Sequence, residues 1–101
     1  MGVLIADEMK FNIGLTLNNF VITIRGNLNM IEKARSSEGL SVYRTYYRML
    51  YYANEASYQN NDAWLQERNE MLILSAEQIN GNIFTHIYDH IKSSYNNTSD
   101  V

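Results

Sequence analysis

The sequence predicts an all-α fold, a compact bundle of three to four helices in a single domain over residues 1–101, with frayed ends at about 1–9 and 96–101. Apolar residues recur at intervals of three and four along most of the chain, which is the spacing of one helix face. Proline is absent, so no residue imposes a kink on a helix. A length of 101 residues allows one modest hydrophobic core.

The first predicted helix begins near Leu15 and ends at the turn-forming run Ser36 to Gly39. Its apolar stripe passes Gly26 without losing phase, which favours a continuous helix although an interior glycine costs about 1 kcal/mol relative to alanine. The stripe consists of Leu17, Phe20, Val21, Ile24, Leu28 and Ile31.

A β-hairpin at about 10–25 is an alternative for the same segment, and it would make the fold α+β. Apolar residues alternate on both sides of Asn18-Asn19, which suits a two-residue turn. The helix is favoured because a lone hairpin is marginal in water and the only other strand candidate is Val3 to Ile5. The alternating residues are Phe11, Ile13, Leu15 and Leu17 before the turn and Phe20, Ile22 and Ile24 after it.

The second predicted helix runs from Leu40 or Ser41 to Tyr58 and holds six of the eight tyrosines. One helix cannot turn six tyrosines toward one core, so some rings must meet solvent or a partner. The predicted core face consists of Tyr43, Tyr46, Tyr47 and Leu50. The residues left for a partner surface are Arg44, Arg48, Tyr51, Tyr52 and Tyr58.

The third predicted helix extends from Ala63 to about Asn80, and a fourth apolar stripe follows Asn82. Ile73 and Leu74 fall outside the main stripe of the third helix on two different sides. A helix that is apolar around most of its girth is central in a bundle or covered by another copy of the chain. We therefore expect a homo-oligomer with Ile73 and Leu74 in its interface.

The density of tyrosine and arginine between Tyr43 and Tyr58 indicates protein binding, because these residue types are enriched in interface hot spots. We expect a non-catalytic module that acts as an adaptor, chaperone or inhibitor. The absence of proline and the many asparagines are typical of A+T-rich coding sequences, including those of phages and mobile elements. The alternative is a small-ligand protein that sequesters a nucleotide between stacked tyrosines and arginines.

Catalysis and metal binding have little support in the sequence, and we expect no cofactor and no enzyme activity. His86 and His90 have the i, i+4 spacing of helical zinc ligands, but no third ligand is fixed by the sequence. Glu67 and Glu70 lie near Arg68, which is typical of a solvated face rather than an acid–base pair.

The remaining expectations concern partners and location. The net charge is −3 and the basic residues are scattered singly, so duplex nucleic acid is not an expected partner. There is no cysteine, no stretch long enough to cross a membrane and no basic residue in the first nine to mark a signal peptide. We expect a cytoplasmic protein, in the host cytoplasm if phage-encoded.

Overall fold

The computed structural model describes residues 2–24 and 30–101 and shows a mostly β protein. Strands account for 45% of the chain and helices for 21%, so the predicted all-α helical bundle is wrong. Leu28 and Gly26, which the first predicted helix included, lie outside the described residues.

Six strands of the described chain form one antiparallel sheet, in which β6 (Ser41–Tyr52) is the central strand. One edge of β6 pairs with β7 (Gln66–Ser75) along almost its whole length. The other edge is shared by two strands. The C-terminal part of β6 pairs with β4 (Phe20–Ile24), and its N-terminal part pairs with β5 (Met30–Arg35).

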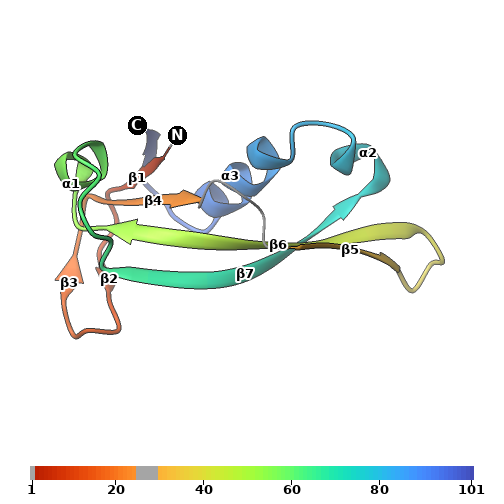
Figure 1. The fold of residues 1–101 in the computed structure, drawn as a ribbon, viewed down its shortest axis with the longest axis horizontal. Helices are drawn as coiled ribbons and strands as arrows, with labels where there is room; N and C mark the ends of the chain where they lie inside the picture. Colours follow the sequence, from red (N-terminus) through yellow and green to blue (C-terminus); the bar gives the residue numbers. More distant parts are fainter. Residues whose placement is uncertain (1, 25–29) are drawn as a thin grey trace.

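Beyond β4 the sheet continues with β1 (Val3–Ile5) and then β8 (Thr98–Asp100). The two ends of the chain, which we expected to fray, therefore lie side by side (Figure 1). Gly2 and Val101 exchange backbone hydrogen bonds of 3.2 and 3.0 Å just outside this strand pair.

The main core lies between the sheet and helix α3 (Ile83–Ser93), which crosses one face. Successive strand residues point to opposite faces, so every second residue of a strand faces this helix. On β6 these are the odd-numbered residues of its C-terminal half. The buried residues of this core are Val3, Ile5, Phe11, Phe20, Ile22, Ile24, Tyr47, Met49, Tyr51, Ile87, Tyr88 and Ile91.

A smaller cluster occupies the opposite face of the sheet beneath the short helix α1 (Glu55–Gln59). Val21, Leu50 and Tyr52 are buried there, and the Tyr58 ring packs edge-on against Tyr52 with 5.5 Å between ring centroids. The C-terminal half of β6 is consequently covered on both faces.

Two hairpins use the same turn. Between β2 (Met9–Lys10) and β3 (Thr16–Leu17), and again between β5 and β6, a three-residue loop ends in a glycine with positive φ. The values are +88° at Gly14 and +79° at Gly39, a conformation that residues with a Cβ rarely adopt. The segment that ends the first predicted helix is therefore the tip of a hairpin.

The rest of the sheet forms an arm, which we define as residues 30–46 and 71–75. It extends past α3 and ends at the β5–β6 turn (Figure 1). The chain measures 43 × 23 × 23 Å, and its radius of gyration of 14.8 Å exceeds the value of about 13 Å for a compact chain of this length.

Helical spacing misled the prediction where strands are buried on both faces, as in β4 and the C-terminal half of β6. Val21 and Ile22 are both fully buried although they point in opposite directions. Such strands lose the alternation of apolar and polar residues by which a strand is recognised. The hairpin alternative also differs from the structure, since β3 pairs with β2 and Asn18-Asn19 leads into the main sheet. Beyond Asn82 the chain is helical as expected, in α3.

Removing the Tyr88 hydroxyl should destabilise the fold. This hydroxyl accepts a 3.0 Å hydrogen bond from the buried backbone N–H of Ile24 and lies 3.2 Å from Thr23 Oγ1, joining α3 to the end of β4. Tyr88→Phe should lower the free energy of unfolding by about 1–3 kcal/mol, because a buried donor loses its acceptor. Urea denaturation measures the loss, and Tyr43→Phe on the half-buried Tyr43 is the control. Equal stabilities of the two variants would contradict this role.

Candidate functional site

The strand conformation of β6 divides the predicted partner residues between two faces of the sheet. Arg44, Arg48 and Tyr52 lie on the face opposite α3, whereas Tyr51 faces α3. Tyr58 lies on α1, above the same face as Tyr52. The surface that we expected to join all five residues is therefore not assembled.

The tyrosines of that set are core residues. Tyr51 is 1% exposed and Tyr52 is 5% exposed, while Tyr58 is half-buried against Tyr52. Phe11 and Phe20 pack on Tyr51 with ring centroids 5.7 and 6.2 Å away. Their rings support the fold, and the arginines are the members of the set that reach the surface.

Both arginines have carboxylate partners. Arg44 Nη1 lies 2.6 Å from Glu32 Oε1, and both side chains are 45% exposed. Arg48 Nε lies 2.9 Å from Glu67 Oε2, although the N–H direction does not make this contact a hydrogen bond. Exposed pairs of this kind contribute about 0–1 kcal/mol each, so neither arginine is essential to the fold.

Ile73 and Leu74 are neighbours on β7 and point to opposite faces. Leu74 is a buried core residue that is 1% exposed, whereas Ile73 is 54% exposed. The strand register places Ile73 beside Arg44, and it places Met30, Tyr46 and Met71 in the adjacent row of the same face. We call the set Met30, Arg44, Tyr46, Met71 and Ile73 the open face of the arm.

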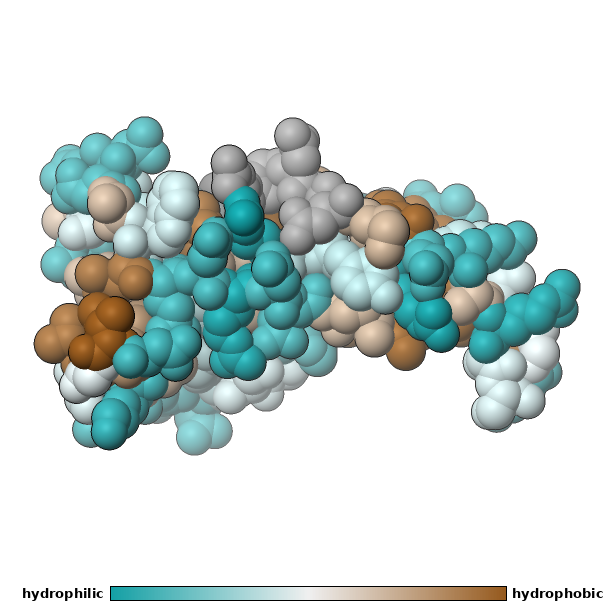
Figure 2. All heavy atoms as spheres, turned by 60° about the horizontal axis from the view of Figure 1, so that its bottom comes forward, coloured by the Kyte–Doolittle hydropathy of each residue, from teal (hydrophilic) through white to brown (hydrophobic). Residues whose placement is uncertain are grey.

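The open face carries large apolar side chains in contact with water. Met30 is 49% exposed and Met71 is 40% exposed. Figure 2 shows hydrophobic atoms gathered at the left end, over the β2–β3 hairpin, and smaller hydrophobic areas among polar atoms along the arm. Exposed apolar rows bordered by polar residues are typical of protein contact sites.

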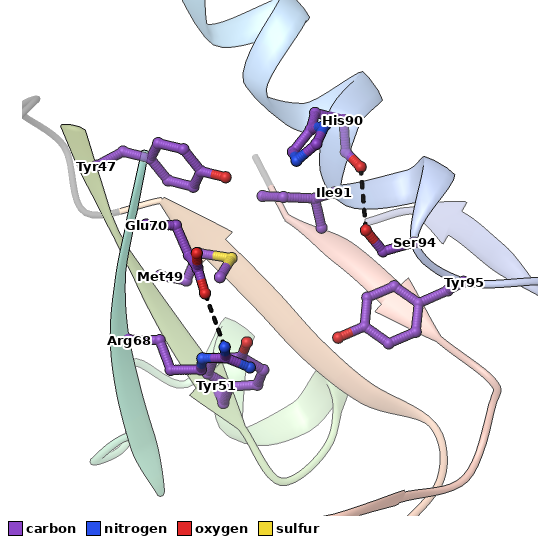
Figure 3. Close-up of a pocket in the computed structure, with 9 residues that line it drawn as sticks. All are labelled: Tyr47, Met49, Tyr51, Arg68, Glu70, His90, Ile91, Ser94 and Tyr95. Carbon is purple, nitrogen blue, oxygen red and sulfur yellow. Dashed lines mark hydrogen bonds and ion pairs between the residues drawn. The ribbon is translucent and has the colours of Figure 1, made fainter. Parts of the chain in front are cut away.

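A second candidate site is a cavity of about 220 Å³ between the C-terminal half of α3 and strands β6 and β7. It is partly open to solvent. Figure 3 shows side chains from both strands and from the helix region converging on it. The residues that line it are Tyr47, Met49, Tyr51, Arg68, Glu70, His90, Ile91, Ser94 and Tyr95.

Polar groups lie along one side of this cavity. Arg68 Nη2 lies 2.8 Å from Glu70 Oε1. The Tyr51 and Tyr95 hydroxyls belong to the same lining, and the Tyr95 hydroxyl lies 3.8 Å from Met9 Sδ. The cavity therefore has polar groups at the edge of an apolar core.

The three tyrosines of the cavity have raised pKa values. Burial raises the pKa of Tyr51 to about 12, and burial likewise raises the pKa of Tyr95. Burial raises the pKa of Tyr47 as well, and the Glu70 carboxylate adds to this effect. At neutral pH all three hydroxyls are neutral groups that can donate and accept hydrogen bonds.

The sequence did not predict this cavity. It assigned Glu70 and Arg68 to a solvated helix face and Tyr47 to a helical core. The residues come from three separate parts of the chain, and no spacing in the sequence links them. The nearest signal was the density of tyrosine in 43–58, which identified two of the three tyrosines without their partners.

Of the two histidines, only His90 lines the cavity. His86 lies one turn earlier on α3. Within residues 2–24 and 30–101, no three histidine, aspartate or glutamate side chains converge as metal ligands. In the same part of the chain, no helix is long and apolar enough to cross a membrane.

Comparison of this chain with protein-family models, with curated proteins and with solved structures gives no match. Its function must therefore be inferred from its own surface and cavity.

The raised pKa of Tyr51 predicts a loss of stability in alkali. Between pH 10 and about 12 the folded chain keeps a proton that the unfolded chain releases, so the free energy of unfolding falls as pH rises through this interval. The loss should be on the order of 2 kcal/mol. Urea denaturation of the wild type and Tyr51→Phe measures it. The variant should show a smaller slope with pH, and parallel curves would contradict the assignment.

Proposed function

We propose that this chain is a small, non-catalytic protein-binding module that works as a homodimer joined along the outer edge of β7. The observation that supports this most is the unpaired edge itself. In the part of the chain that the structure describes, β7 pairs with β6 alone over its ten residues. Its outward backbone N–H and C=O groups are a template for another strand.

The composition of β7 indicates where the second copy pairs. Glu67, Arg68 and Glu70 protect the N-terminal half, because charged side chains on an edge strand oppose pairing. The run Met71 to Leu74 has no charge and no proline. An unprotected apolar edge is an aggregation hazard unless a partner covers it, and a second copy is the partner always present.

The register follows from the side chains. If two β7 strands pair antiparallel about Leu72, Met71 of each copy faces Ile73 of the other on the open face. A register centred on Glu70 would instead oppose the two Glu70 carboxylates, which is unfavourable. Pairing about Leu72 covers residues 70–74 and keeps charges away from each other. It also joins the open faces of the two arms into one surface.

The joined open faces supply the surface for a further protein partner. Arg44 is the cross-strand neighbour of Ile73, so its guanidinium borders the apolar rows. Tyr46 and Met30 extend the rows toward β5. A partner that offers apolar side chains with carboxylates beside them fits this surface, since arginine binds carboxylates well. A role as adaptor, chaperone or inhibitor and a cytoplasmic location stay predictions.

Ile73→Lys should dissociate the dimer. The charge would stand opposite Met71 of the second copy, and we expect the dissociation constant to rise roughly ten-fold or more. Light scattering coupled to size exclusion measures the mass, with the wild type at twice 11.7 kDa. The control is Ile13→Lys, because Ile13 is equally apolar, 58% exposed and located on the β2–β3 hairpin. A wild type that stays monomeric at every concentration would overturn the dimer.

The double change Arg44→Ala and Arg48→Ala separates partner binding from dimer formation. We expect the dimer mass to be unchanged and the free energy of unfolding to fall by no more than about 1 kcal/mol for each exposed ion pair. Recovery of the partner from the native host should fall, because the carboxylate-binding groups are gone. If Ile73→Lys abolishes recovery of the partner but the double arginine variant recovers it in unchanged amount, the arginines do not belong to the binding site.

A further inference from the structure

We propose that the cavity between α3 and strands β6 and β7 binds a small, neutral aromatic heterocycle of about the size of one nucleobase. This inference is independent of the dimer. The arrangement behind it is an arginine–glutamate pair on one side of a cavity with both polar and apolar walls, and tyrosine rings at its two ends (Figure 3).

The volume limits the ligand to one ring system. At about 30 Å³ for each water of the liquid, 220 Å³ corresponds to roughly seven waters. Sites for drug-sized ligands measure about 300–1,000 Å³. The cavity therefore accommodates a group of roughly seven to ten non-hydrogen atoms, and the sugar and phosphates of a nucleotide would have to lie outside it.

The charges favour a neutral ligand. Arg68 and Glu70 compensate each other at 2.8 Å, and the three tyrosine hydroxyls are neutral at pH 7, with burial raising the pKa of each above its ordinary value. A charged ligand would lose water without gaining an uncompensated opposite charge, which is unfavourable. A neutral ring with a donor beside an acceptor can bond to both members of the pair, the acceptor to Arg68 and the donor to Glu70.

The walls favour an aromatic ligand. Met49 and Ile91 supply an apolar surface, and the rings of Tyr47 and Tyr95 stand on opposite sides of the space. Thioether and ring faces both pack well on aromatic groups. Among the described residues the Tyr47 hydroxyl has no hydrogen-bond partner, and Figure 3 shows it directed toward the helix side of the cavity. That hydroxyl can bond to the polar edge of a ligand.

Titration of the ¹⁵N-labelled full chain with free uracil, cytosine or adenine, followed by NMR, tests the proposal. At least one of these bases should give saturable shifts confined to the cavity, at Tyr47, Arg68, Glu70, His90 and Tyr95. Tyr47→Phe keeps the ring and removes the hydroxyl, so it should raise the dissociation constant by roughly five-fold, the value of one hydrogen bond.

The matched control is Tyr46→Phe, which removes a hydroxyl from the adjacent residue on the opposite face and should leave binding unchanged. Benzoate tests the preference for a neutral ligand and should bind more weakly than the bases. Absence of saturable shifts with all three bases would overturn the proposal. Tighter binding of benzoate, or an equal effect of the two tyrosine variants, would do so as well.

Discussion

The rest of the structure depends on the pairing of β6, which is hydrogen-bonded on both edges and covered on both faces in its C-terminal half. One edge aligns β7, and the other aligns β4 and β5 in succession. Because a buried strand must satisfy its backbone groups, this pairing fixes the register of three neighbouring strands. Tyr51 and Tyr52 then become core residues on opposite faces.

The same strand continues into a region that the helices leave largely uncovered. At its C-terminal end β6 lies between α3 and α1, but toward Ser41 it enters the arm. One chain of this length supplies a single core, and burying the arm as well would require another layer. The proposed dimer places a second copy where that layer is missing. The exposed side chain of Ile73 and the buried one of Leu74 reflect this boundary.

The cavity lies at another boundary, where α3 ends and leaves the strand surface incompletely covered. Tyrosine suits such a position, since its ring belongs to the core and its hydroxyl reaches the polar side. Arg68 and Glu70 are on the face of β7 that points toward the helix, so their ion pair borders the cavity although both side chains also contact solvent. Buried rings and solvated polar groups therefore meet at one small site.

The sequence by itself indicated that the chain is long enough for one modest core, that the stretch after Asn82 is helical and that tyrosines and arginines mark the segment 43–58. It did not determine that 41–52 is a strand, because the C-terminal half of β6 is apolar on both faces and thus imitates helical spacing. Only the tertiary structure decided which rings are buried and which groups line the cavity. The physical reason is that strand pairing joins residues far apart in the chain, as Tyr51 joins Ile22 and Gln66, and no local pattern records those contacts.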